Sequence, residues 1–345
     1  MPLAVLSPAE RGGVVEFLAS AFRLPTTAPF LDEALLRWKY DTPRPDWQGS
    51  RSYAWMEGSE IAAHACVCPV TYCVGGRRVA ASYLIDWASS RRSPGAGVLL
   101  LRKLAALFPV LLAIGGSADT RQILPKLGYK AAGELAFFVR VVRPWRQFRT
   151  DPSRRGWKAP LRLTRNAIWS ARAAPRAAAG WKATAILEFA REHEPLFETG
   201  APYPAGRRTV DLMNYYLACP GASMTAFLMK RNGERMGWFV LSRVAGVMRI
   251  ADLRIGSSDP EEWNAAYATA TRTALADPHT CELIGAASTP IGGEALRASG
   301  FRLHHKDPIY VLDPGNLLAG GAPFEVSLIE SDAAFLYSPE YPYIT

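Results

Sequence analysis

Cysteine and long apolar runs are scarce in this 345-residue chain, and each scarcity excludes a class of protein. The five cysteines are too few and too scattered for a disulfide scaffold. Cys66 and Cys68 would share one face of a strand, but no second pair of ligands stands at zinc spacing, so we expect no metal site. The most apolar run, residues 104–114, is interrupted by Pro109 and is far shorter than the roughly 20 residues that a membrane-spanning helix needs.

We also expect no export signal in the first residues, since they carry Glu10 and Arg11 and no long apolar segment. With 49% apolar and 21% charged residues, the composition is that of a globular protein rather than a disordered one. A length of 345 residues suits two domains. We therefore expect a soluble, cytoplasmic protein of two domains.

Residues 81–101 hold the most informative pattern. An apolar run ends at Asp86, a glycine-rich turn follows at 93–97, and leucines resume at helical spacing after Val98. A strand, a glycine turn and a helix start in this order present unpaired backbone N–H groups at the positive end of a helix, where a phosphate fits. The pattern predicts a pyrophosphate-binding loop. An ordinary strand-to-helix turn, in which the glycines relieve crowding, is the alternative.

The segment Arg92-Ser-Pro-Gly95-Ala-Gly97 resembles the R-x-x-G-x-G coenzyme A loop of the GNAT acyltransferase superfamily. A turn at residues 57–60, another at Gly75-Gly76, and Leu127-Gly128-Tyr129 flank it in the family's order. The resemblance implies an α+β or α/β fold, with a mixed, mostly antiparallel sheet flanked by helices. It also implies acetyl-CoA or another acyl-CoA as co-substrate.

The same resemblance implies roles for individual residues. Backbone N–H groups at the end of the fourth strand would contact the thioester carbonyl; these belong to Trp87, Ala88 and Ser89. The loop would hold the pyrophosphate, through Arg92, Ser93, Gly95, Ala96, Gly97 and Val98. Ser117 replaces an asparagine often seen in the family and is expected to contact the cofactor. The chain departs from the family at Leu124, where a tyrosine is common, and at Pro94, which has no N–H to offer.

Asp86 is the first candidate for a catalytic general base. It lies where the predicted strand enters the loop, and burial there is expected to raise its pKa toward the working range. The alternative is a structural carboxylate that caps the following turn. Asp252, at the equivalent place in the second half, favours that alternative. His64, amid alanines of a predicted strand, is read as a core histidine.

Four landmarks of the first half recur in the second half in the same order, displaced by about 165 to 180 residues. The repeat predicts two GNAT-like lobes, at 1–142 and 183–325, with a linker at 143–182 and a tail at 326–345. The second lobe has Ser257-Ser-Asp259-Pro-Glu261-Glu262-Trp263 in place of the loop, and its acids would repel a diphosphate. Only the first lobe is therefore expected to bind coenzyme A, while the second shapes the acceptor pocket.

Residues 140–182 carry twelve Lys or Arg residues and one acid, a net charge of +11 against +9 for the whole chain. Four tryptophans are interleaved with these charges: Trp145, Trp157, Trp169 and Trp181. The mixture suits an anionic membrane surface, which would make the protein peripheral to the inner membrane face. A solvated connector helix is the alternative. No recognised nucleic-acid module accompanies the charge, so nucleic acid is not the expected partner.

Together these patterns predict an acyltransferase that moves an acetyl or other acyl group from acyl-CoA to a small-molecule amine, by direct attack in a ternary complex. An amino sugar or another cell-surface precursor is the suggested acceptor. Two alternatives stay open. One is a Fem-like aminoacyl transferase, whose donor is charged tRNA and which needs no diphosphate loop. The other is a non-catalytic binding protein of GNAT fold, which the departures at Pro94, Ser117 and Leu124 favour.

Overall fold

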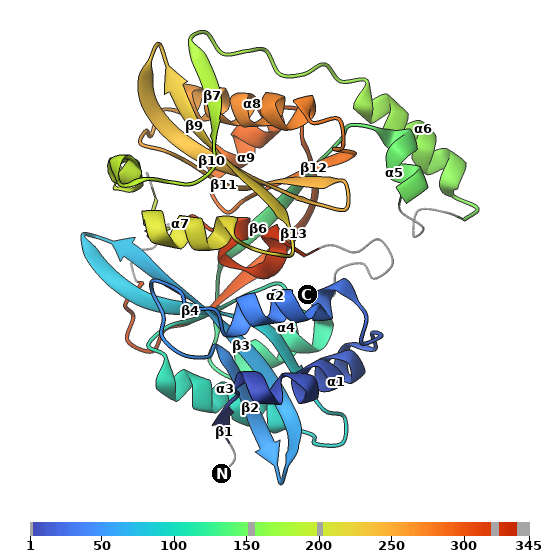
Figure 1. The fold of residues 1–345 in the computed structure, drawn as a ribbon, viewed down its shortest axis with the longest axis vertical. Coiled ribbons are helices and arrows are strands. Elements are labelled where there is room, and N and C mark those ends of the chain that lie inside the picture. The colour runs from blue at the N-terminus through green and yellow to red at the C-terminus, as the bar shows by residue number, and fades with distance from the viewer. Residues whose placement is uncertain (1–2, 151–155, 199–202, 319–323, 337–345) are drawn as a thin grey trace. The chain divides into compact units, whose positions relative to one another are not determined.

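The computed structural model describes residues 3–150, 156–198, 203–318 and 324–336. These residues form two compact units (Figure 1). Unit 1 contains residues 3–134 and 307–318, and unit 2 contains the remaining described residues.

Unit 1 opens with a short strand and two helices and continues mainly with strands. Asp32 caps the second helix by accepting a hydrogen bond from the amide of Leu35, at 2.9 Å. The elements in chain order are β1 (Leu3–Val5), α1 (Arg11–Phe22), α2 (Glu33–Tyr40), β2 (Ser52–Glu57), β3 (Glu60–Val74), β4 (Arg77–Ser89), α3 (Ala96–Leu107), β5 (Leu111–Ile114) and α4 (Ala118–Lys126). The strand β6 (Lys130–Val141) follows and leads into unit 2.

Unit 2 repeats this order after a pair of short helices. Its helices are α5 (Pro144–Thr150), α6 (Ala159–Ser170), α7 (Val210–Leu217), α8 (Pro260–Ala276) and α9 (Pro290–Ala298). Its strands are β7 (Trp181–Ile186), β8 (Ala205–Gly206), β9 (Ser223–Arg231), β10 (Glu234–Val244), β11 (Val247–Ile255) and β12 (Glu282–Ala287). The strand β13 (Arg302–Leu312) then leads back into unit 1.

The sheets of the two units have the same topology. Unit 1 has the order β1-β2-β3-β4-β5-β13, and unit 2 has the order β7-β9-β10-β11-β12-β6. The first four strands of each are antiparallel, whereas the fifth runs parallel to the fourth and is reached through a helix, α3 or α8. These mixed, mostly antiparallel sheets flanked by helices confirm the predicted fold class.

The last strand of each sheet comes from the other half of the chain. In unit 1, β13 pairs with β5 from Ile309↔Ile114 to Leu312↔Leu111. In unit 2, β6 pairs with β12 from Ala136↔Ala287 to Val141↔Glu282. The compact units therefore divide within β6 and β13 rather than at residues 142 and 183, and residues 143–182 belong to unit 2. The repeat in the sequence gives no sign of this exchange, because each strand follows its own helix without a break.

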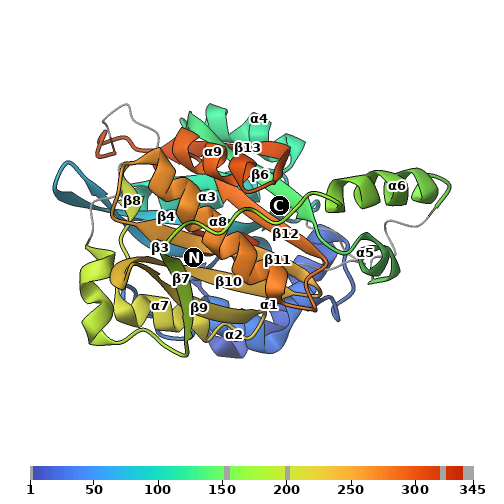
Figure 2. The same ribbon diagram turned by 90° about the horizontal axis from the view of Figure 1, so that it is seen from above.

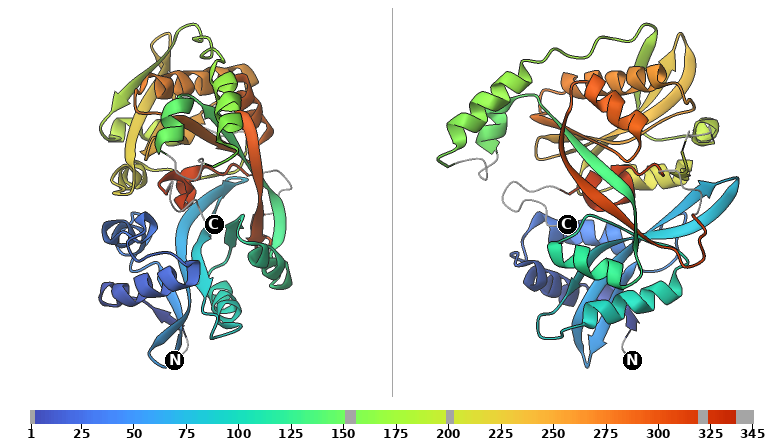
Figure 3. Two further views of the ribbon diagram at one scale, coloured as in Figure 1. Left: turned by 90° about the vertical axis from the view of Figure 1, so that its right-hand side faces the viewer. Right: turned by 180° about the vertical axis from the view of Figure 1, so that it is seen from behind.

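Each unit has its own apolar core. In unit 1, Leu100 and Leu104 of α3 are buried against Val67 of β3 and Leu111 of β5. In unit 2, α8 and α9 pack against each other (Figure 3). Trp263 of α8 is fully buried. The helices α5 and α6 contact each other and extend away from the sheet of unit 2 (Figure 2). No helix in the described part of the chain has both the length and the apolar character to cross a membrane.

Candidate functional site

The fourth and fifth strands of unit 1 diverge. They pair only where Ser82 and Tyr83 of β4 face Leu111 and Leu112 of β5. Beyond that point β4 continues to Ser89 with its other edge on β3. Among the described residues, no strand covers the β5-facing edge of β4 after Tyr83. Trp87, Ala88 and Ser89, the residues expected to contact a thioester carbonyl, lie on this stretch.

The loop that follows β4 ends in an uncapped helix start. Gly95 is the N-cap of α3 and has a φ of +90°, a conformation that favours glycine. The amides of Ser93 and Ala96 are bonded within the loop, to Ser90 O and Ser93 O, both at 3.2 Å. Within the described chain, the amides of Gly95, Gly97 and Val98 donate no hydrogen bond. The predicted set of pyrophosphate donors is therefore reduced to these three.

Gly97 brings the helix start against the end of β4. A Cβ atom at this position would lie 3.1 Å from Ser89 Cβ and 3.2 Å from Trp87 Nε1. The indole of Trp87 donates a hydrogen bond to the carbonyl of Gly97, at 3.3 Å. The structure thus brings together the strand end and the loop that the sequence assigned to one ligand. Free amides at a helix start and an open strand edge form a geometry suited to an anion with an extended arm.

A carboxylate lies beside this loop. The hydroxyl of Ser93 donates to Oε2 of Glu57, the last residue of β2, at 2.6 Å. Glu57 is exposed and Ser93 is partly exposed, so this negative charge lies at the surface beside the loop. Arg92, whose amide bonds the hydroxyl of Ser90 at 3.2 Å, supplies an exposed positive charge on the same loop.

Asp86 is buried, with 1% of its surface exposed. It lies at a bulge in β4 with a φ of +53°, which aspartate tolerates better than most residues. Its Oδ2 forms an ion pair with Lys39 Nζ at 2.7 Å and accepts a hydrogen bond from Tyr40 at 2.6 Å. Burial, with the Asp86 carboxylate close by, raises the pKa of Tyr40 well above its usual value. These contacts to α2 favour a structural role over the catalytic one expected from the sequence.

His64 belongs to the same buried cluster and is held neutral. Its Nδ1 donates to the carbonyl of Asp86 at 3.1 Å, and its Nε2 accepts from the hydroxyl of Ser52 at 2.9 Å. Burial lowers the pKa of His64 to about 4. The histidine is fully buried and hydrogen-bonded at both nitrogens, as expected for a core residue.

The stability of unit 1 is expected to fall as the pH is lowered from about 6.5 to about 4. In that range an unfolded histidine binds a proton that native His64 does not, so protonation favours unfolding, by about 3 kcal/mol at the acid end. NMR titration of the His64 ring measures this directly, with His64→Gln identifying the signal. A midpoint near 6.5 for the native ring would contradict the prediction.

The other predicted site residues have local structural partners. The Ser117 hydroxyl caps α4 by accepting from the amide of Thr120 at 3.2 Å, and it does so from an exposed position. Leu124 is buried in the core of unit 1.

In the described part of the chain, no group of three or more His, Cys, Asp or Glu side chains is arranged to hold a metal ion.

The corresponding helix start in unit 2, that of α8, is capped by the side chain of its N-cap residue, Asp259. Asp259 accepts from the amide of Glu261 at 3.0 Å, and Glu261 and Glu262 add two acids to the first turn. Asp252, the counterpart of Asp86, is likewise buried and ion-paired, with Arg208 at 2.7 Å. Burial would raise the pKa of Asp252, but two guanidinium groups, of Arg208 and Arg254, hold it below its usual value.

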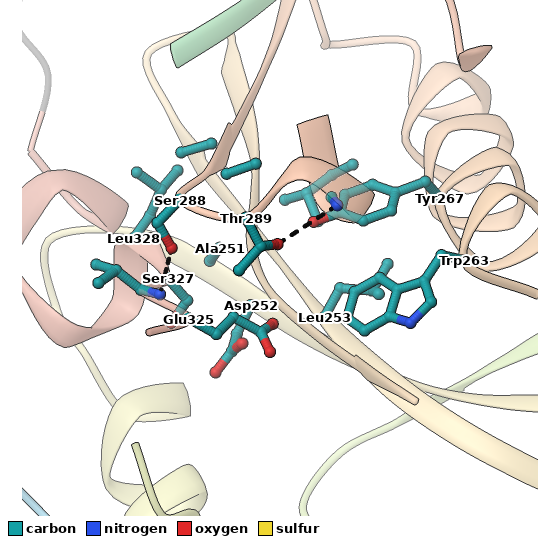
Figure 4. Close-up of a pocket in the computed structure, with 15 residues that line it drawn as sticks. Ala251, Asp252, Leu253, Trp263, Tyr267, Ser288, Thr289, Glu325, Ser327 and Leu328 are labelled. Carbon is teal, nitrogen blue, oxygen red and sulfur yellow. Dashed lines mark hydrogen bonds between the residues drawn. The ribbon is translucent and has the colours of Figure 1, made fainter. Parts of the chain in front are cut away.

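A segment of the chain bridges the gap where β11 and β12 diverge. These strands pair only over Val247–Arg249, and beyond that point residues 324–328 lie between their ends (Figure 4). Ser288 Oγ donates to Phe324 O at 2.9 Å and accepts from Val326 N at 2.8 Å, while Glu325 pairs with Arg254 at 2.9 Å. Burial raises the pKa of Glu325 to about 7. The remaining pocket is lined by Asp252, Tyr267 and Glu325.

Sequence reasoning missed both this bridging segment and the cations that neutralise the two buried acids. Residues 324–328 carry no motif, and Lys39 lies in an ordinary amphipathic helix. Of the predicted tail at 326–345, the residues after 336 lie outside the described residues.

No protein-family model matches the sequence, and no curated protein matches it either. Solved structures do match. Saccharomyces cerevisiae N-myristoyltransferase, solved with myristoyl-CoA bound, gives a TM-score of 0.59 at 12% identity and covers 91% of this chain and 82% of its own. A GCN5-related N-acetyltransferase from Anabaena variabilis gives 0.58 at 12% identity, over 90% and 72%. One from Kribbella flavida gives 0.50 at 15% identity, over 90% and 71%.

The chain has the GNAT fold. The resemblance of Arg92–Gly97 and its flanking turns to that superfamily predicted this result, and the structural matches confirm it over most of the chain. Within the GNAT fold, the open strand edge and the uncapped helix start both belong to unit 1. The equivalent place in unit 2 is occupied by residues 324–328.

Proposed function

We propose that this protein transfers an acyl group from acyl-CoA to an amine acceptor, with the acyl-CoA bound by unit 1. The observation that carries the proposal is the set of three free amides, of Gly95, Gly97 and Val98, at the start of α3. Amides at a helix start are a common site for phosphate groups. The similar structures include N-acetyltransferases and an N-myristoyltransferase with bound myristoyl-CoA, which supports the same ligand class.

The difference between the units supports a single acyl-CoA site. In unit 2, Asp259 caps the helix start, and residues 324–328 fill the gap between the diverging strands. A diphosphate there would face the carboxylates of Asp259, Glu261 and Glu262. Unit 1 has neither obstacle among its described residues.

The chemistry follows from what the residues of unit 1 offer. The pyrophosphate would lie against the loop amides and Arg92, and the acyl-pantetheine arm against the exposed edge of β4. Backbone N–H groups near Trp87–Ser89 would polarise the thioester carbonyl; one such donor is worth about 3 to 4 kcal/mol in the transition state. The acceptor amine attacks the carbonyl carbon and loses a proton to solvent, the C–S bond breaks, and the coenzyme A thiolate leaves and takes up a proton. Asp86 is not assigned as the base, since its carboxylate is buried and paired with Lys39.

Calorimetric titration with acetyl-CoA and with free coenzyme A tests the proposal. Micromolar binding is expected, followed by thiol release when an amine acceptor from a small panel is added. Binding without thiol release for any amine would favour the non-catalytic alternative. Absence of binding to either ligand would contradict the proposal and favour a donor that needs no diphosphate loop.

Replacing Glu57 by glutamine is expected to increase the affinity for coenzyme A about threefold to tenfold at low salt. The substitution removes a negative charge whose oxygen lies 2.6 Å from Ser93 Oγ in the loop. The gain should shrink as salt screens the charge. Glu16→Gln, at an exposed carboxylate of α1, is the matched control and should have no effect. Unchanged affinity in the Glu57 variant at low salt would show that the diphosphate does not approach this loop.

A further inference from the structure

The helical pair α5–α6 of unit 2 carries an apolar face that points to solvent. Trp157, just before α6, is 83% exposed, and Leu161 and Ile168 are 71% and 67% exposed. At 100° per residue, Leu161 and Ile168 differ by only about 20° around the helix. These two side chains form one stripe, and Trp157 lies in the turn just before the helix.

The opposite face of α6 attaches the pair to unit 2. Asn166 is buried and donates to Gln147 of α5 at 3.0 Å, and Gln147 in turn donates to Glu282 of β12. The ring of Trp169 lies between two guanidinium groups, those of Arg165 at 4.5 Å and Arg302 at 4.7 Å. The apolar stripe is thus the outward side of an anchored helix, and its exposure does not come from a loose attachment.

Positive charge lies along one side of the stripe. Lys158 and Arg165 are exposed, and Arg165 lies about 40° around the helix from Leu161. The guanidinium of Arg165 also donates to Oδ1 of Asn166 at 3.0 Å. Residues 140–182 as a whole contain twelve Lys or Arg residues and one acid. A second copy of the chain would bring two positively charged surfaces together. A nucleic acid would bring the apolar side chains of Leu161 and Ile168 against phosphate groups. An interface of acyl chains with anionic headgroups satisfies both the aliphatic and the basic side chains.

We propose that α5–α6 docks on an anionic phospholipid bilayer, with Trp157, Leu161 and Ile168 inserted at the level of the headgroups and Lys158 and Arg165 paired with lipid phosphates. The proposal does not depend on acyl transfer. It deepens the expectation drawn from the basic, tryptophan-rich sequence by naming the inserted side chains.

Flotation of the full chain with vesicles tests it. At least tenfold more protein should float with vesicles of phosphatidylcholine and phosphatidylglycerol at 2:1 than with phosphatidylcholine alone. The variant L161S/I168S should lose at least tenfold in partition coefficient, because only an inserted stripe needs these side chains. Leu187→Ser, at a 99% exposed leucine of unit 2, is the matched control and should float like the parent.

A variant that lacks two positive charges distinguishes binding to lipid from binding to other polyanions. K158Q/R165Q should lower flotation severalfold, whereas R77Q/R78Q, at exposed cations of unit 1, should leave it unchanged. Equal recovery with neutral and anionic vesicles would overturn the proposal, as would full flotation of L161S/I168S. Binding of a single-stranded RNA that K158Q/R165Q weakens and L161S/I168S does not, without flotation of the parent, would assign the surface to nucleic acid instead.

Discussion

Glutamate in place of Gly95 is expected to weaken binding of coenzyme A at least 100-fold. The position has a φ of +90° and no neighbouring atom within 4 Å of an added Cβ, so the new side chain would project into open space beside the free amides. Its carboxylate would repel the diphosphate, and a residue other than glycine strains the left-handed conformation by about 1 to 2 kcal/mol. Isothermal titration with coenzyme A and with acetyl-CoA measures the loss.

The matched control for this variant is Gly75→Glu. Gly75 also has a positive φ, +55°, and open space around its Cβ, but it lies in the turn between β3 and β4. The control therefore introduces the same charge and a similar strain in the same unit without touching the loop. Parent-like affinity in the control and loss in Gly95→Glu would locate the diphosphate at α3. Equal affinity in all three proteins would contradict the proposed site.

Asparagine in place of Asp86 is expected to destabilise unit 1 by about 3 to 5 kcal/mol. The substitution keeps the size and the tolerance for a φ of +53°, but it removes the negative charge that pairs with the ammonium of Lys39, which is 1% exposed. The double variant K39M/D86N removes both charges and should recover part of the loss. Thermal and urea unfolding measure the effect.

A structural and a catalytic Asp86 give different results. In the structural case, D86N unfolds more readily while the folded protein keeps its affinity for coenzyme A and its rate of thiol release within a few fold. Asp252→Asn in unit 2 should behave in the same way, because Arg208 and Arg254 would lose their shared counter-charge. A D86N protein of parental stability with thiol release lowered 100-fold or more would restore the catalytic assignment.

Local patterns predicted much of unit 1. The turns at residues 57–60 and Gly75-Gly76 marked the ends of β2, β3 and β4, and the glycines of Arg92–Gly97 located the turn before α3. These features depend on neighbouring residues, since a helix start, a hairpin or an uncapped amide is determined within a few positions of the chain. The asymmetry between the units was also visible, because Asp259 and the acids after it stand in the sequence where the first half has glycines.

Residue roles that depend on distant partners could not be predicted. The sequence offered Asp86 as a base, and the structure pairs its carboxylate with Lys39 and Tyr40, of which Tyr40 is 46 positions away. Ser117 is expected to contact a cofactor, and in the structure its hydroxyl caps α4. In both cases the sequence shows the chemistry of the side chain but not its partner.

The sequence by itself determined the order of elements, the loop before α3 and the excess of positive charge in residues 140–182, since all three are properties of adjacent residues. Only the tertiary structure decided that β6 and β13 complete each other's sheets, that residues 324–328 close the gap in unit 2, and that Leu161 and Ile168 face solvent. These outcomes depend on which surfaces are buried against each other, and the segments that supply those surfaces lie far apart in the chain. A linear pattern records the propensity of each segment but not the choice of its partner.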